Sequence, residues 1–280
     1  MWTQVMSHPG VRWISLGWAG FIAENLVLSH NRGAIIESIG EDNYHRSYSA
    51  LSTVACSSIA YGYFRHGRAQ GPRLVRPIWA GLGSLTLQGL GLVGFSQLAP
   101  KLQTPFVHRA PTASTLSSTG LGAAEDGAAA SPASAPGAWR PRCPIDFTPT
   151  DEPQDGVYGL KRITRHGMFW SLGLFGLGSA LSTVYVTEII CFSAPAVFAA
   201  IGGAHQDYRF RHGMGGTLPD DVYNSTSLLP FAALLTGHQR WTDVLSELKD
   251  VNAAGAVTLA LLLAFRRMPR GVIPQSIPSR

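Results

Sequence analysis

The stretch GMFWSLGLFGLGSALSTVYVTEIICFSAPAVFAAIGGA, residues 167–204, decides the fold that we predict for this chain. It is 38 residues long and carries one charged side chain, Glu188. A membrane-spanning helix needs about 20 mostly apolar residues, so this stretch is too long for one span. It fits two spans joined by a tight turn, which we place near Ser179–Ser182.

Four further apolar stretches are long enough for a span or nearly so, at residues 11–28, 47–64, 77–99 and 252–265. With the hairpin they predict an all-α fold, a polytopic membrane helix bundle of about six transmembrane helices. The glycines in 77–99 and 167–178 favour close packing between helices in such a bundle. The alternative is a groove kept open for a flat or elongated apolar ligand.

Residues 110–139 interrupt this pattern, because they consist largely of Ala, Ser, Pro, Thr and Gly. Such a composition buries too little apolar surface to offset the entropy of ordering. We therefore expect a disordered loop inserted at 108–157. It separates a first part with three spans, 1–107, from a second part, 158–280, with the hairpin, an interfacial helix around 228–235 and the final span.

The net charge of +5 would ordinarily raise the question of nucleic acid. Here the basic residues flank the apolar stretches, as in the loop 65–76 and after residue 265, and form no continuous stripe. We therefore expect membrane lipids as partners and no nucleic acid.

A basic cluster precedes the hairpin. Arg162, Arg165 and His166 are spaced i, i+3 and i+4, so on one helix they share a face and could converge on an anionic group. They are candidate catalytic residues, with His166 as a proton relay at a cavity mouth. The alternative is structural: the cluster anchors a helix start to headgroups and pairs with Asp207 or another acid.

Polar side chains within the apolar stretches are further candidates, because they are costly there. We expect Glu188 near the middle of its span, with a polar partner and a catalytic role, and Glu24 at the close of the first helix. His205, Asp207 and Arg209 are candidate ligand-binding residues, since a carboxylate can fix the tautomer of a histidine. The alternative for these three is a hydrogen-bonded cluster at a helix end.

Several motifs together resemble the NnrU family of polytopic membrane proteins, in the same order along nearly the whole chain outside the insertion. They are ENLVLSHNRG (24–33), IGEDNYHRSYSALSTVA (39–55), RITRHG (162–167), AIGGAHQDYR (200–209) and STSLLPFAALLTGHQRW (225–241). That family includes the plastid 15-cis-ζ-carotene isomerase. The resemblance implies an integral, multi-pass membrane protein, in a plastid membrane, that acts on or near carotenoids. A basic residue before a histidine at a helix start also occurs in membrane methyltransferases.

The isomerase is understood to hold haem b through histidine ligands. This chain has Asn25 and Ala200 at the two corresponding positions, which disfavours haem; His30, His166 and His205 remain as replacement ligands. We therefore expect a protein that binds an apolar small molecule, such as a carotenoid, another isoprenoid or a tetrapyrrole. The alternative is an enzyme, a cis-trans isomerase of carotenoid double bonds with a rearranged haem site.

Overall fold

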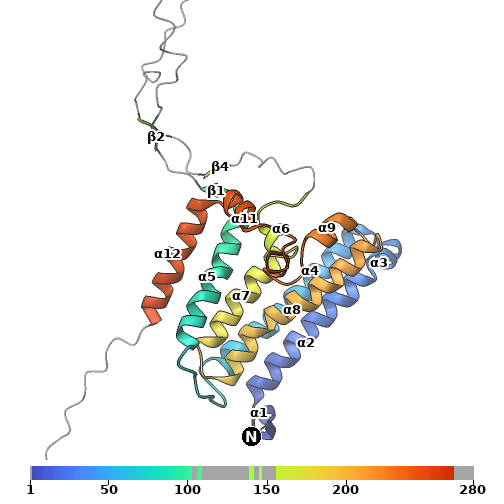
Figure 1. The fold of residues 1–280 in the computed structure, drawn as a ribbon. Coiled ribbons are helices and arrows are strands. Elements are labelled where there is room, and N and C mark those ends of the chain that lie inside the picture. Colours follow the sequence, from blue (N-terminus) through green and yellow to red (C-terminus); the bar gives the residue numbers. More distant parts are fainter. Residues whose placement is uncertain (1, 103–105, 109–138, 142–144, 147–155, 268–280) are drawn as a thin grey trace, which may run out of the picture. The chain divides into compact units, whose positions relative to one another are not determined.

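The computed structural model describes residues 2–102, 106–108, 139–141, 145–146 and 156–267 (Figure 1). They fall into two compact units, one of residues 1–99 with 151–280 and one of residues 100–150.

The larger unit is built from helices, as the sequence predicts. Their bounds are α1 (Trp2–Ser7), α2 (Pro9–His30), α3 (Arg32–Ile39), α4 (Glu41–Gly62), a π-helical turn η1 (Tyr63–Gly67), α5 (Ala80–Leu98), α6 (Leu160–Ile163), α7 (Gly167–Leu181), α8 (Val186–Arg211), α9 (Asp220–Ser225), α10 (Ala232–Leu235), α11 (Trp241–Glu247) and α12 (Asp250–Arg267).

The six long helices contact one another in the order α12, α5, α7, α8, α2 and α4, so that α8 lies between α7 and α2, and α4 lies behind α8 in the view of Figure 1. Helices α7 and α8 form the predicted hairpin, and its turn falls after Leu181, next to the predicted place. The C-terminal end of α5 is held by Lys249, whose ammonium donates to the carbonyls of Gln97 and Ala99 at 2.9 and 2.8 Å. A cation at this end of a helix is favourable.

Glycine brings α5 and α7 into backbone contact. A Cβ atom on Gly91 would lie 2.6 Å from the Phe175 backbone nitrogen, and one on Gly178 would lie 2.7 Å from the Gln88 backbone nitrogen. Neither position therefore has room for a side chain. These contacts support close packing as the role of the glycines, and not an open groove.

The core between α2, α4 and α8 contains Ile14, Ile59 and Cys191, with aromatic side chains packed around them. A second buried cluster joins α7 to α8 through Trp170, Ala196 and Ala199. Burial of these side chains holds α8 between α7 on one side and α2 with α4 on the other.

The prediction of six membrane spans is corrected by the structure. Helices form at all six places. Among the residues that the structure describes, one helix, α8, is long and apolar enough to cross a membrane; a second span results if α11 and α12, which are bent by 91° at the break between them, count together as one. Helix α7 has 15 residues, about 22 Å at the α-helical rise, against a hydrocarbon core of about 30 Å. Helix α5 is diluted by polar side chains, including the buried Ser84 and Gln88, and α4 begins with a polar turn.

The smaller unit contains the predicted low-complexity loop. Its described residues pair as short antiparallel strands, β1 (Lys101–Leu102) with β4 (Ile145–Asp146) and β2 (Phe106–His108) with β3 (Trp139–Pro141). The predicted disordered stretch lies outside the described residues up to residue 138.

Candidate functional site

The basic cluster 162–166 does not share one helix face. Helix α6 ends at Ile163, Thr164 is extended, and α7 begins at Gly167 with His166 at its N-cap position. The chain leaves the helix at Thr164, whose hydroxyl donates to the Leu228 carbonyl at 2.8 Å. Arg162 is thereby separated from Arg165 and His166, which corrects the predicted convergence on one anion.

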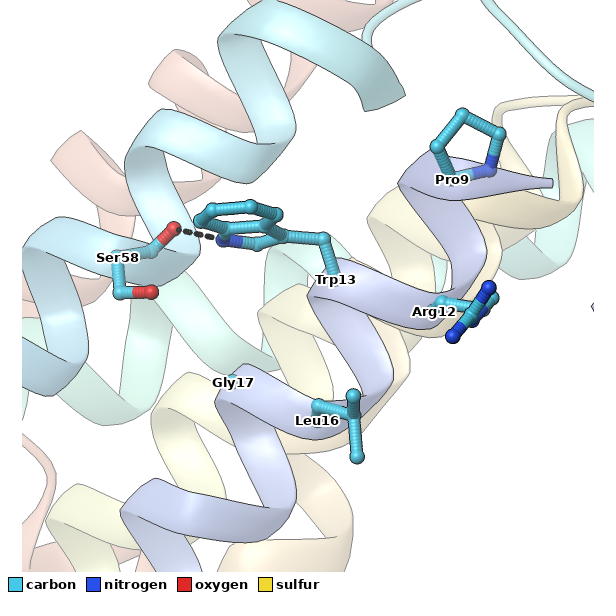
Figure 2. Close-up of a pocket in the computed structure, with 6 residues that line it drawn as sticks. All are labelled: Pro9, Arg12, Trp13, Leu16, Gly17 and Ser58. Atoms are coloured by element: carbon cyan, nitrogen blue, oxygen red, sulfur yellow. Dashed lines mark hydrogen bonds between the residues drawn. The ribbon is translucent and has the colours of Figure 1, made fainter.

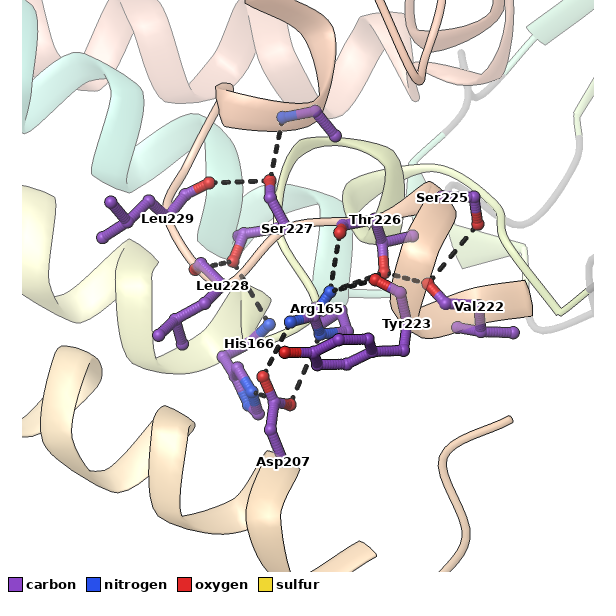
Figure 3. Close-up of polar contacts among 12 residues, drawn as sticks. Arg165, His166, Asp207, Val222, Tyr223, Ser225, Thr226, Ser227, Leu228 and Leu229 are labelled. Atoms are coloured by element: carbon purple, nitrogen blue, oxygen red, sulfur yellow. Dashed lines mark hydrogen bonds and ion pairs between the residues drawn. The ribbon is translucent and has the colours of Figure 1, made fainter. Parts of the chain in front are cut away.

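Arg165 and His166 both contact Asp207, which lies in the last turns of α8 (Figure 3). The Arg165 guanidinium donates two hydrogen bonds to the Asp207 carboxylate, at 3.3 and 2.7 Å, and His166 Nε2 lies 2.8 Å from the same carboxylate. All three side chains are about nine-tenths buried. We call this group the Asp207 clamp, because it ties the start of α7 to the end of α8.

The rest of the Arg165 guanidinium contacts the C-terminal end of α9. It donates to the carbonyls of Tyr223 and Thr226 at 3.0 and 2.7 Å, and it lies over the Tyr223 ring, 4.7 Å from the centroid (Figure 3). Five donor positions on one planar group can hold several elements at once. The hydrogen-bond donors of the Arg165 guanidinium are thus taken up by acceptors of the protein itself.

Arg162 belongs to a second ion pair, with Glu247 of α11. Its guanidinium donates to both carboxylate oxygens, at 2.8 and 2.7 Å, and to the Gln239 side chain at 2.8 Å. Burial alone would raise the pKa of the Glu247 carboxyl. The hydrogen bonds from Arg162 and the Gly159 N–H outweigh burial, and this pKa lies below its ordinary value. These contacts favour the structural alternative for the basic cluster.

The two carboxylates predicted within spans are both displaced from their expected positions. Glu188 lies in the first turn of α8, not near its middle, and accepts hydrogen bonds from the Ala69 N–H at 3.0 Å and from the Thr183 hydroxyl. Glu24 lies inside α2, not at its end, and accepts from the Ser52 hydroxyl of α4 at 2.8 Å. Glu188 therefore caps a loop instead of facing a cavity.

A cavity of about 200 Å³ lies beside α8, with walls from α2, α4 and α7. We call it the inner cavity. Phe169 and Phe198 give it apolar walls, and the Asn25 amide oxygen, which it also contains, accepts a hydrogen bond from the Tyr48 hydroxyl. Its lining residues are Asn25, Leu26, Ser29, Tyr48, Phe169, Phe198, Gly202, His205, Gln206 and Arg209.

Two polar groups of the inner cavity are buried without a partner. Arg209 is 9% exposed, and its Nε has no hydrogen-bond acceptor; its guanidinium donates to the Met214 carbonyl at 2.8 Å. Among the described residues no acid pairs with it. His205 Nε2 is likewise buried without a partner. Asp207 lies between His205 and Arg209 in the sequence, but its side chain belongs to the Asp207 clamp. The structure therefore separates it from the other two residues.

His30 and His205 come together although they lie on different helices. Their ring centroids are 5.5 Å apart and the rings are tilted by 36°. Two axial imidazoles would have to face each other across a macrocycle. The neighbouring cavity of about 200 Å³ is below the range of roughly 300–1,000 Å³ typical of pockets for drug-sized ligands. The residues as placed do not fit haem, and His166, engaged with Asp207, lies outside this cavity.

A larger hollow, about 450 Å³, lies at the start of α2 between Trp13, Arg12 and Ser58 (Figure 2). The Trp13 indole donates to the Ser58 carbonyl at 2.9 Å, and Leu16 beside it is 70% exposed. Its polar groups are satisfied or open to the surface. The inner cavity is the stronger site, because its wall includes a buried charged group, the Arg209 guanidinium, whose Nε has no hydrogen-bond partner.

A family model described as NnrU protein matches residues 14–269. The chain belongs to the NnrU family. The match begins within α2 and extends beyond the end of α12. It includes the residues that line the inner cavity and those of the Asp207 clamp. No curated protein and no solved structure matches this NnrU protein at a significant level.

Several residues of these sites were not predicted from the sequence of this NnrU protein. Glu247 and Tyr223 hold the two arginines, yet they lie far from them in the chain and carry no local pattern. Gln239, which also contacts Arg162, and Tyr48 lie inside two of the motifs shared with the family, which was the available signal for them.

Proposed function

We propose that this NnrU protein is a multi-pass integral membrane protein that holds part of an amphipathic isoprenoid in the inner cavity, which at about 200 Å³ is too small for a tetrapyrrole. The observation that carries the proposal is the buried Arg209 guanidinium at the cavity wall without an acidic partner. A buried cation with no counter-charge is costly, so a ligand with an anionic group would stabilise it.

Exposed apolar side chains support a membrane location. Leu16 of α2, Val54 of α4, Leu82 of α5, Val197 of α8 and Phe265 of α12 are all between 48% and 73% exposed. Apolar side chains on the outer faces of five packed helices are favourable in contact with lipid.

The walls of the inner cavity define the ligand further. Phe169 and Phe198 suit an apolar ring or chain, whereas His205 and Arg209 call for hydrogen-bond acceptors. A carotene hydrocarbon has no such acceptor. A ligand with a carboxylate or phosphate at one end satisfies both halves, so we favour such a ligand over a hydrocarbon carotenoid.

The alternative function, cis-trans isomerisation of carotenoid double bonds with a rearranged haem site, is disfavoured because the rings of His30 and His205 lie too close together to hold a haem between them. The visible spectrum of the detergent-purified protein, oxidised and reduced, with a pyridine haemochrome assay, separates the two. A Soret band with one haem per chain would overturn the binding proposal in its present form.

The direct test is to extract and identify the small molecules that copurify with the protein. Gly202→Leu should fill the inner cavity, because Gly202 lines it beside the Phe198 ring, whereas Gly20 of α2 is exposed with nothing within 4 Å of an added Cβ. We expect an amphipathic isoprenoid in extracts of the wild type and of the Gly20→Leu control, and little in those of Gly202→Leu. Equal extracts from all three proteins would refute the assignment of the cavity.

A further inference from the structure

We propose that a second cavity, adjoining the inner one at Arg209, is a phosphate site that holds a phosphate or diphosphate end group. This deepens the proposed function, on which it rests for the apolar part of the ligand. The second cavity measures about 430 Å³ and lies between the α2–α3 junction and the loop that follows α8. We call it the loop cavity; the residues that matter are His30, Arg32, Arg209, Gly213, Met214 and Gly215.

Two guanidinium groups from opposite sides of the loop cavity meet at Gly215. A Cβ atom placed on this glycine would lie 3.2 Å from Arg32 Nη1 and 3.2 Å from Arg209 Nη2. Arg32 begins α3 and Arg209 is near the end of α8, so the tertiary structure alone brings them to one point. Two like charges this close repel each other unless an anion lies between or beside them.

The protein supplies little negative charge to offset them. Arg32 pairs with Glu41 at 3.1 Å, but the Glu41 side chain is 63% exposed, and such a surface pair is weak and screened by salt. Arg209 has no acidic partner among the described residues. His30 adds a third donor to the same cavity, with its ring stacked on Tyr208. The loop cavity is therefore cationic at its centre.

The loop 213–216 is shaped to leave this space open. Gly213 and Gly215 have φ angles of 67° and 81°, in the left-handed region that favours glycine. At Gly215 the missing side chain is also what lets the two guanidiniums approach, because any Cβ would press on both.

The arrangement suits a phosphate better than a carboxylate. A guanidinium presents donors in a fork that matches two phosphate oxygens, and a phosphate has enough oxygens and charge for two such forks plus an imidazole. A carboxylate with two oxygens and one charge is satisfied by a single arginine. Because Arg209 lines both cavities, a ligand with its phosphate in the loop cavity would have its apolar part directed to the inner cavity.

The test measures binding of farnesyl diphosphate, farnesol and inorganic pyrophosphate to the full chain in detergent, by equilibrium dialysis at low and high salt. We expect farnesyl diphosphate to bind at least about tenfold more tightly than farnesol, because hydrogen bonds between charged groups are stronger than those of a neutral hydroxyl. Arg32→Gln should remove most of that advantage. Arg46→Gln, which changes an exposed arginine of α4, should not.

The outcomes separate this inference from the proposed function. Equal binding of farnesyl diphosphate and farnesol would overturn the phosphate site and leave the apolar ligand standing. Binding of pyrophosphate that depends on Arg32, without binding of either prenyl compound, would support a site for free phosphates and refute the isoprenoid. Tight binding that is the same in Arg32→Gln and Arg46→Gln would overturn the phosphate site.

Discussion

The Asp207 carboxylate accepts two hydrogen bonds from the Arg165 guanidinium, at 3.3 and 2.7 Å, and both side chains are about nine-tenths buried. Two residues further along α8, Arg209 is equally buried but has no acid. One helix end thus carries two buried arginine sites of opposite character, a neutralised one that holds the fold and an unpaired one that faces two cavities.

Asp207→Asn should destabilise the protein by about 3–5 kcal/mol, because it leaves the buried Arg165 charge without a counter-ion. A thermal or denaturant melt of the detergent-solubilised protein measures this. The matched control is Asp220→Asn, since Asp220 lies 3.8 Å from Arg211 and is 84% exposed, where such a pair contributes at most about 1 kcal/mol. Similar losses in the two variants would contradict the clamp.

Arg209→Met and Arg165→Met should shift stability in opposite directions. Arg165→Met removes a guanidinium that is fully hydrogen-bonded within the protein. It leaves the Asp207 carboxylate buried and charged, so the melting midpoint should fall. Arg209→Met removes an unpaired buried charge and should leave the midpoint of the ligand-free protein unchanged or higher, while anion binding is lost. A fall with Arg209→Met as large as with Arg165→Met would show that Arg209 is structural.

Gly178→Ala should lower the melting midpoint, because its Cβ would lie 2.7 Å from the Gln88 nitrogen and 2.8 Å from the Ser84 carbonyl oxygen, both backbone atoms that cannot rotate away. Gly255→Ala in α12 is the matched control, with nothing within 4 Å of the added atom. There alanine should stabilise the helix by up to about 1 kcal/mol. Equal midpoints for the two variants would refute close α5–α7 packing.

Acid should weaken the contact between Arg162 and Glu247. The pKa of Glu247 is lower in the folded protein than its ordinary value, so the carboxylate contributes stability above the unfolded pKa, and this is lost as pH falls through the folded pKa. At neutral pH the wild type should have a higher melting midpoint than Glu247→Gln. This difference in melting midpoint should disappear below about pH 4.3. Glu37→Gln, at an exposed site of α3, should show no such difference.

The helices and the hairpin turn could be predicted because apolar runs and their ends are local properties of the sequence. The number of membrane spans could not, because it depends on helix length and on polar residues such as Gln88, which the bundle buries between α5 and α7. The prediction that Arg162, Arg165 and His166 share one helix face was wrong. Thr164, which lies between them, is extended, and its hydroxyl donates to the carbonyl of Leu228, far away in the sequence.

The sequence by itself determined an all-α bundle in the larger unit, a helical hairpin at 167–204 and membership of the NnrU family. Only the tertiary structure decided that Arg162 meets Glu247, 85 residues away, that Arg165 and His166 share Asp207, and that Arg32 and Arg209 meet at Gly215. Helical periodicity acts over a few residues along the chain, whereas ion pairs and cavities depend on which helices become neighbours. That choice is made by the packing of α8 between α7 and α2.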